Sequence, residues 1–265
     1  MSESLTRSIS GIIYIVLLIG ATLFSNWTFD LLIIFFLFVG IFEFSKLYKI
    51  NLVTSFIIGI FFTIPLISGN ESFQKTLPYV LIFEIPFLFF LIYDLFKADF
   101  KIYRNNNLKY IFLLGYVIFP FLILTQLPLL QGNYQPNIVI GMFILIWNND
   151  TFAYICGKSF GKRKLFEKMS PKKTIEGFIG GLLFTLIAAY ILSIYFTIFN
   201  LNTWLLTAIF VSVFGTIGDL VESKFKRQAN IKDSGSIMPG HGGILDRLDS
   251  VIFATPFLFL IYLIQ

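Results

Sequence analysis

The residues whose types suit chemistry are concentrated in one polar segment, residues 223–249, which lies between two apolar stretches. The segment reads SKFKRQANIKDSGSIMPGHGGILDRLD and holds five Lys or Arg residues, three Asp residues, four Gly residues and the only His of the chain. Such a density of charge has no structural use in a chain made mostly of Phe, Ile and Leu. We therefore expect the functional site in this segment.

Paired carboxylates at the two ends of the segment suit a metal ion. Asp219 and Glu222 are three residues apart, and Asp246 and Asp249 repeat this spacing, so each pair falls on one face of a helix. Carboxylate oxygens without a Cys or His cluster suit Mg²⁺ rather than zinc. We expect Mg²⁺ ligation by Asp219 and Asp246, with Asp249 as a further ligand. The alternative is that some of these acids only form ion pairs with nearby Lys and Arg residues.

The PGHGG sequence at residues 239–243 suits a phosphate-binding loop. Small residues let backbone N–H groups approach an anion closely, here just before a helix N-terminus. Lys226, Arg227 and Lys232 would add positive charge. Turns also need glycine, so the pattern alone leaves both interpretations open. His241 could bind phosphate or carry a proton, or it could order the loop through a hydrogen bond.

A second polar group lies upstream, at residues 147–181. Asp150 falls inside an apolar stretch, where an acid is costly and topology gives no reason for it. A basic loop follows, and Ser170-Pro171 predicts the start of the next helix. The alternative is an ordinary capped loop. The glycines of GFIGG, residues 177–181, predict close packing of that helix against a neighbour.

The composition is that of an integral membrane protein. Hydrophobic residues make up 57% of the chain, charged residues only 13%, and the mean hydropathy is +0.82. A spanning helix needs about 20 mainly apolar residues, and nine such stretches predict an all-α, polytopic helical bundle. The runs are continuous rather than alternating, which excludes a β-barrel. The predicted spans are about 9–25, 28–46, 53–69, 78–96, 108–130, 136–156, 175–199, 203–222 and 248–264.

The distribution of positive charge predicts the orientation. With nine spans and a cytoplasmic N-terminus, every one of the 20 Lys and Arg residues except Lys75 falls on the cytoplasmic side. The loops at 157–173 and 223–247 then face the cytoplasm, where nucleotides and metals are available. The net charge of +5 becomes a local field suited to anionic lipid head groups or phosphates. The alternative, charge that only sets topology, explains the loop at 97–109 but not these two loops.

We expect a single integral-membrane domain over residues 1–265. Residues 1–140 carry plain apolar spans and are expected to act mainly as scaffold, whereas residues 141–265 carry nearly all the polar features. Cys156 is the only cysteine, so we expect neither a disulfide nor a multi-cysteine metal site, and we assign it a packing role.

Two motifs in the second half resemble those of the phosphatidate cytidylyltransferases, also called CDP-diacylglycerol synthases. The resemblance covers about the last 110 residues, and Ile175 and Met238 are mild departures at positions without a polar role. The first motif comprises Ser223, Lys226, Arg227, Lys232 and Asp233, followed by His241, Gly242, Gly243, Asp246, Arg247 and Asp249. The second comprises Asp150 to Tyr154, Gly157, Phe160-Gly161-Lys162, Ser170-Pro171, Lys173-Thr174 and Glu176-Gly177.

The resemblance implies transfer of a cytidylyl group from CTP to phosphatidic acid, giving CDP-diacylglycerol and pyrophosphate with Mg²⁺ as cofactor. It leaves room for a second, monovalent cation and for a homodimer, and it implies membrane lipids but no nucleic acid as partners. The site would lie in a multi-pass protein of the cell membrane and face the cytoplasm. The implied catalytic residues are Asp246, Asp219, Lys226 and Arg247, with Asp219, Asp246 and Asp249 as metal ligands. The implied substrate-binding residues are Arg227, Lys232, His241, Gly242, Gly243, Ser223, Lys173 and Asp150.

Two other classes of protein share some of these features. A cation-coupled transporter also places carboxylates in broken helices, but near mid-membrane and in paired repeats, neither of which the sequence shows. Another nucleotide-dependent lipid phosphotransferase, such as a CDP-alcohol phosphotransferase, would carry its acids along one continuous helix. Here a basic loop separates Asp219 from Asp246.

Overall fold

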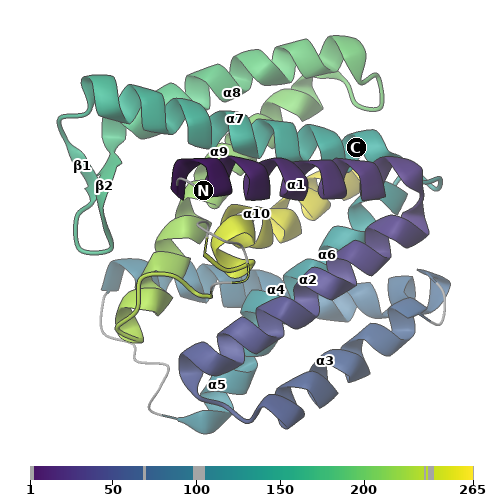
Figure 1. The fold of residues 1–265 in the computed structure, drawn as a ribbon. Coiled ribbons are helices and arrows are strands. Elements are labelled where there is room, and N and C mark those ends of the chain that lie inside the picture. Colours follow the sequence, from purple (N-terminus) through teal and green to yellow (C-terminus); the bar gives the residue numbers. More distant parts are fainter. Residues whose placement is uncertain (1–2, 68–69, 98–104, 236, 238–241, 265) are drawn as a thin grey trace. The chain divides into compact units, whose positions relative to one another are not determined.

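The computed structural model describes residues 3–67, 70–97, 105–235, 237 and 242–264. Helices form most of this part of the chain, and the strands within it form a two-stranded antiparallel sheet (Figure 1). The expected all-α class is confirmed, with the small sheet as a departure. The chain forms two compact units: unit 1 comprises Met1–Gln126 and Phe225–Leu248, and unit 2 comprises Leu127–Lys224 and Asp249–Gln265.

Each unit is built from consecutive helices, and the long helices α9 and α10 contribute residues to both units. Unit 1 contains α1 (Glu3–Phe24), α2 (Asn26–Tyr48), α3 (Leu52–Ile67), α4 (Asn70–Lys97), α5 (Asn106–Leu113), the π-helix η2 (Leu114–Ile118) and α6 (Phe119–Gln126). Unit 2 contains the 3₁₀-helix η3 (Leu127–Leu129), α7 (Pro136–Phe160), β1 (Lys164–Phe166), β2 (Ser170–Thr174) and α8 (Ile175–Tyr195). The shared helices are α9 (Leu201–Gln228) and α10 (Leu245–Ile264).

Within the described ranges, seven helical segments are long and apolar enough to cross a membrane. They are Asn26–Tyr48, Gln74–Lys97, Asn106–Leu129, Pro136–Phe160, Ile175–Tyr195, Leu201–Gln228 and Leu245–Ile264. Two shorter apolar segments, Ser8–Phe24 and Leu52–Leu66, occupy the positions of the first and third predicted spans. Seven of the nine predicted spans thus correspond to segments that are long and apolar enough to cross a membrane, and α1 and α3 lie at the positions of the first and third predicted spans.

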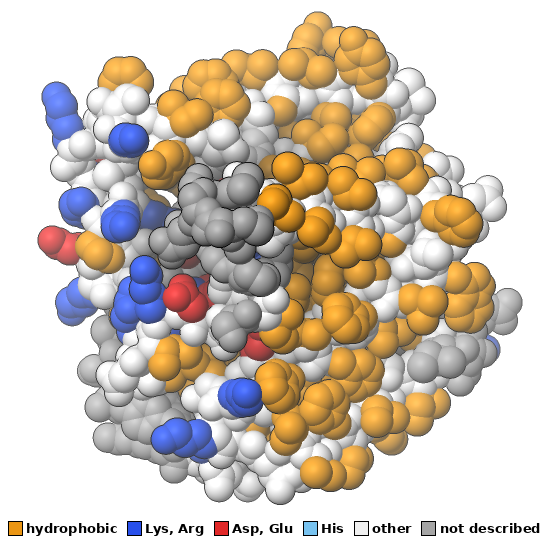
Figure 2. Space-filling model, in the orientation of Figure 1, with side chains coloured by type: hydrophobic (Ala, Val, Ile, Leu, Met, Phe, Trp, Pro, Cys, Tyr) orange, Lys and Arg blue, Asp and Glu red, His pale blue; other side chains and the backbone are white. Residues whose placement is uncertain are grey.

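The outward faces of these helices are apolar. Phe24, Trp27 and Tyr195 are among many large side chains that are more than half exposed, and hydrophobic side chains cover much of the face shown in Figure 2. Contiguous exposed apolar surface of this extent is unfavourable in water but favourable in hydrocarbon. The protein is therefore a membrane protein.

Unit 1 holds the last turn of α9 in an aromatic pocket. Phe225 is fully buried, and its ring centroid lies 6.1 Å from that of Tyr48 on α2, 6.0 Å from that of Phe112 on α5 and 4.8 Å from that of Tyr116 on η2. All three pairs are edge-on, the geometry that the ring quadrupole favours. Because Phe225 is fixed in this pocket, the position of the next residue, Lys226, is fixed as well.

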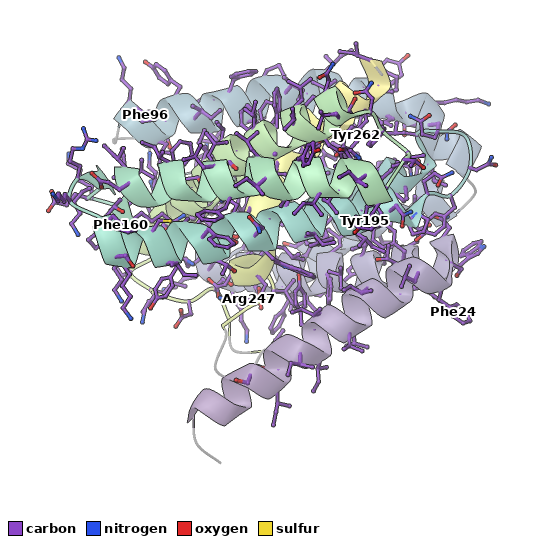
Figure 3. The ribbon with its side chains drawn as sticks, turned by 90° about the horizontal axis from the view of Figure 1, so that it is seen from above. Phe24, Phe96, Phe160, Tyr195, Arg247 and Tyr262 are labelled. Atoms are coloured by element: carbon purple, nitrogen blue, oxygen red, sulfur yellow. The ribbon has the colours of Figure 1, made fainter. Side chains whose placement is uncertain are left out.

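Unit 2 is built on an antiparallel helix pair, α7 and α8, which run side by side with Phe160 at one end and Tyr195 at the other (Figure 3). Glycines make the close contact possible. A Cβ atom on Gly177 would lie 2.7 Å from the carbonyl oxygen of Ala153, and one on Gly180 would overlap the thiol of Cys156. The predicted packing roles of the GFIGG glycines and of Cys156 are confirmed.

The start of α8 differs from the prediction. Ser170 and Pro171 do not begin a helix; they lie in β2, which pairs with β1 in the register Lys164 to Thr174 and Phe166 to Ser170. The helix begins at Ile175, and Thr174 is its N-cap, because its hydroxyl accepts the N–H of Gly177 at 3.1 Å. Serine and proline suit a helix start, but here pairing with β1 keeps residues 170–174 extended, so the helix begins five residues later than predicted.

The Gly177→Ala variant tests the close contact of α7 and α8. We expect a loss of about 1–3 kcal/mol in the free energy of unfolding, because the new methyl group meets backbone that cannot rotate away. The measurement is the thermal unfolding midpoint in detergent. Gly20→Ala is the matched control, since no atom lies within 4 Å of the added Cβ, and its midpoint should stay constant or rise slightly. Equal midpoints in the two variants would contradict the packing argument.

Candidate functional site

Asp246, in the first turn of α10, organises the polar segment within unit 1. Its Oδ2 accepts three hydrogen bonds: from the backbone N–H of Ser234 at 2.8 Å, the hydroxyl of Ser234 at 2.9 Å and the N–H of Gly243 at 2.7 Å. Its Oδ1 accepts a hydrogen bond from the ammonium of Lys226 at 2.6 Å. Both carboxylate oxygens are therefore engaged, and the side chain is largely buried.

For the acids of this segment, the sequence left open whether they bind a metal ion or only form ion pairs with nearby bases. Asp246 forms such an ion pair, with Lys226. The two side chains are 14% and 6% exposed, so water screens their attraction only weakly. Lys226 follows the buried Phe225, and Asp246 receives donors from its own loop, so neither partner has to be ordered by the ion pair alone. The pair has a fixed geometry, in contrast to a surface pair that pays rotamer entropy to form.

A buried acid from α2, Glu43, completes this arrangement. The side chain is only 2% exposed. Its two oxygens accept the backbone N–H groups of Ile244 and Leu245, each at 3.0 Å, and one of them accepts the hydroxyl of Ser234 at 3.3 Å. Hydrogen bonds to a charged group contribute about 1.5–3 kcal/mol each, and a carboxylate at a helix N-terminus is further stabilised by the helix dipole.

Sequence reasoning missed Glu43 because it lies in the half of the chain expected to be scaffold. An acid within a predicted apolar span is the signal that could have found it, by the same argument that singled out Asp150. The partner could not have been found in this way, because Ile244 lies 201 residues further along the chain.

The glycines of the segment make room for these carboxylates. A Cβ atom on Gly243 would overlap the hydroxyl of Ser234 and the carboxylate of Glu43, and one on Gly235 would also overlap Glu43. Gly242 has a φ of +89°, in the left-handed region that favours glycine, and a Cβ there would crowd Asp246. The N–H groups expected to receive a phosphate thus donate to the protein's own acids at residues 243–245.

Three other basic residues of the segment are available to a ligand, whereas Lys224 is buried. Arg227, Lys232 and Arg247 are exposed, and Arg227 makes a long contact of 3.5 Å to the carbonyl oxygen of Ile231. His241 lies outside the described residues, so its role stays a prediction.

Unit 2 brings together the other predicted site residues. Lys173, from β2, forms an ion pair with Asp219 on α9, and Ser223 donates its hydroxyl to Asp219 at 3.3 Å. Asp249 on α10 lies close enough to Asp219, Asp150 and Lys173 to interact with their charges. Three acids from three helices thus lie in the neighbourhood of Lys173.

Close contact between α9 and α10 places these acids. A Cβ atom on Gly218 would lie 2.6 Å from the carbonyl oxygen of Asp249, so the two backbones touch beside Asp219. One turn earlier, the hydroxyl of Ser250 donates to the carbonyl oxygen of Gly215 at 3.2 Å. The approach of the two helices brings Asp219 and Asp249 together although like charges repel, and this cost is offset by Lys173, by a bound cation or by protonation of one of the acids.

The unit 2 cluster fits a hard cation by donor type. Its acidic side chains supply carboxylate oxygens, which Mg²⁺ prefers. In the part of the chain that the structure describes, no three Asp, Glu, His or Cys side chains are already close enough to form a metal site. Asp246 fits less well, because a metal would have to replace one of its four donors. Its role as a metal ligand stays a prediction.

Comparisons with known proteins agree with the class that the fold and the polar clusters define, a multi-helix membrane protein with paired acids and bases. A sequence model of the Cytidylyltransferase family matches residues 5–265. The chain belongs to this family.

Individual relatives match over a shorter stretch. A phosphatidate cytidylyltransferase of Staphylococcus haemolyticus (strain JCSC1435) is 54% identical over 122 residues, 45% of this chain and 46% of the relative. Proteins of the same name from Staphylococcus aureus (strain COL) and Bacillus subtilis (strain 168) are 52% identical over 122 residues and 51% identical over 124 residues. The first of these also covers 45% of this chain and 46% of the relative, and the second covers 44% of each. The match thus spans less than half the length of these relatives.

The Lys173→Met variant tests the charge balance of the unit 2 cluster. Without the ammonium group the acids repel one another, so we expect the variant to lose about 1 kcal/mol in stability, since the pair with Asp219 is partly exposed. Excess Mg²⁺ should restore the thermal unfolding midpoint, because a cation can replace the lost charge. Lys172→Met, at the exposed neighbouring position, should show neither effect. The same response to Mg²⁺ in both variants would contradict the assignment.

Proposed function

We propose that the protein transfers the cytidylyl group of CTP to phosphatidic acid, giving CDP-diacylglycerol and pyrophosphate, in membrane phospholipid biosynthesis. The observation that carries this proposal is the family match over residues 5–265, and the names of the bacterial relatives give the substrate class. Nothing in the described residues or in the relatives favours a cation-coupled transporter or another lipid phosphotransferase.

The proposed reaction needs no activated side-chain nucleophile. A phosphate oxygen of phosphatidic acid attacks the α-phosphorus of CTP, and the bond from that phosphorus to the bridging oxygen of the β-phosphate breaks, releasing pyrophosphate. A phosphomonoester has its second pKa at about 6, so the attacking oxygen is already ionised at neutral pH. The work of the protein is then to position two anionic substrates and to neutralise the developing charge.

The basic residues of unit 1 are proposed to bind the triphosphate. Lys226 is held by Asp246 and would present a fixed ammonium group, whereas Arg227, Lys232 and Arg247 are exposed and would close on the phosphates as they bind. Gly242, Gly243 and His241 are proposed to lie beside the nucleotide. Charged groups that are held in place before the reaction cost no reorganisation when charge moves to the leaving group.

The acids of unit 2 are proposed to hold Mg²⁺. Asp219 and Asp249 are the first choices, and Ser223, Lys173 and Asp150 would orient the substrates. When bound, Mg²⁺ would supply neutralisation of the triphosphate and of the departing pyrophosphate. A second, monovalent cation is part of the same proposal.

The protein is proposed to lie in the cell membrane with its N-terminus and active site facing the cytoplasm. The bacterial relatives and the apolar helices support a cell-membrane location, and the distribution of Lys and Arg supports the orientation. In unit 2, Lys162, Lys164, Lys168 and Lys172 are exposed around the β1–β2 hairpin, where Figure 2 shows basic side chains gathered. Phosphatidic acid would enter sideways from the bilayer, and a homodimer is compatible with the proposal.

Pyrophosphate release by the purified protein in detergent tests the reaction. We expect release only when Mg²⁺, CTP and phosphatidic acid are all present, with a CDP-lipid as the second product. Asp246→Asn should slow pyrophosphate release by roughly a hundredfold or more. The amide cannot accept hydrogen bonds from Lys226, Ser234 and Gly243 together, so Lys226 would no longer be held in position. Glu167→Gln, at an exposed acid in the β1–β2 turn, should keep wild-type activity. Release without the lipid, or an active Asp246→Asn enzyme, would contradict the proposal.

Cysteine labelling tests the orientation. In a Cys156→Ala background, a cysteine at Ile231 should react with a membrane-impermeant maleimide only after the cells are opened. A cysteine at the exposed Asn133, in the 131–135 loop, should react in intact cells, since the predicted topology puts that loop outside. Labelling of both positions in intact cells, or of neither, would refute the topology.

A further inference from the structure

Both carboxylate oxygens of Glu43 accept hydrogen bonds from the polar segment, residues 223–249. The two N–H groups that it accepts, those of Ile244 and Leu245, are at the N-terminus of α10, where backbone donors have no partner within the helix. A helix N-terminus preceded by glycines is a general binding place for a free anion. Here a residue from α2 fills that place.

Glu43 and Asp246 share the same donor, which couples them. The hydroxyl of Ser234 lies 3.3 Å from Glu43 and 2.9 Å from Asp246, and Gly243 and Gly235 have no side chain where the Glu43 carboxylate lies. The Glu43 carboxylate therefore occupies the space that these glycines leave open, where it accepts hydrogen bonds from the backbone of residues 244 and 245. Asp246 in turn holds Lys226, so a chain of contacts leads from α2 to the lysine that is proposed to bind the triphosphate.

We propose that Glu43 is a positioning residue for the nucleotide, acting through Ser234, the backbone of residues 243–245 and Asp246 on Lys226. The inference rests on the proposed function for its kinetic consequence. It also means that the motifs of the second half do not form a working site without α2, although the first half carries no recognisable motif.

The Glu43→Gln variant tests the proposal in the full-length protein. Glutamine keeps the volume but turns one acceptor into a donor, which then faces an N–H group. We expect kcat for pyrophosphate release to fall by about tenfold and KM for CTP to rise by about fivefold, while KM for phosphatidic acid changes by less than about twofold. A merely destabilised protein has less active enzyme, which lowers the apparent kcat but cannot raise one KM selectively.

Glu84→Gln is the matched control. Glu84 is a fully buried acid on α4 in the same unit, and no described residue hydrogen-bonds to either of its oxygens. The same substitution there should leave both KM values unchanged. If Glu43→Gln fails to fold, Ser234→Ala removes the shared hydroxyl while keeping the backbone donor, and it should raise KM for CTP by about threefold.

Hydrogen–deuterium exchange separates the inference from the proposed reaction. In Glu43→Gln, the amides in the peptide covering residues 242–248 should exchange faster than in the wild type, whether or not the wild type releases pyrophosphate. Faster exchange together with an inactive wild type would overturn the reaction while the loop-holding role stands. Unchanged exchange, or a folded Glu43→Gln enzyme with wild-type kcat and KM values, would overturn the inference.

Discussion

Two acids inside a shell of N–H donors hold the polar segment of this protein in its conformation. Burying a carboxylate is costly unless donors surround it, and leaving the first N–H groups of a helix without acceptors is costly as well. Glu43 and Asp246 offset both costs at once, because the backbone of residues 243–245 supplies the donors and the acids supply the acceptors. The glycine content of the segment and the fixed position of Lys226 both follow from this arrangement.

The two polar clusters differ in how their acids are engaged, and this difference supports different roles. In unit 1, both oxygens of Asp246 accept hydrogen bonds, from the ammonium of Lys226 and from three donors of Ser234 and Gly243. In unit 2, Lys173 forms an ion pair with Asp219, and Asp249 lies close enough to Asp219, Asp150 and Lys173 to interact with their charges. The first arrangement suits a lysine held in a fixed position beside phosphate, whereas a group of neighbouring carboxylates suits the binding of a cation.

Glycine serves the same physical purpose at several places in unit 2. At Gly177 and Gly218, an absent Cβ lets one helix touch the backbone of another. In an apolar environment helices gain little from burying more hydrocarbon, so close van der Waals contact at small residues becomes the main source of attraction. The contact at Gly218 also sets the separation of Asp219 and Asp249, which links helix packing directly to the chemistry of the cluster.

The sequence by itself determined the membrane class, the approximate helix positions and the residues that carry the polar chemistry, because hydropathy and local charge are read along the chain. The helix start predicted at Ser170-Pro171 was wrong, because strand pairing with β1 outweighs the local preference of these residues for a helix start. Only the tertiary structure decided that Asp246 pairs with Lys226, that Lys173 pairs with Asp219, and that Glu43 caps α10. These pairs depend on which helices pack together. Residues about 200 positions apart share no local sequence pattern from which their contact could be predicted.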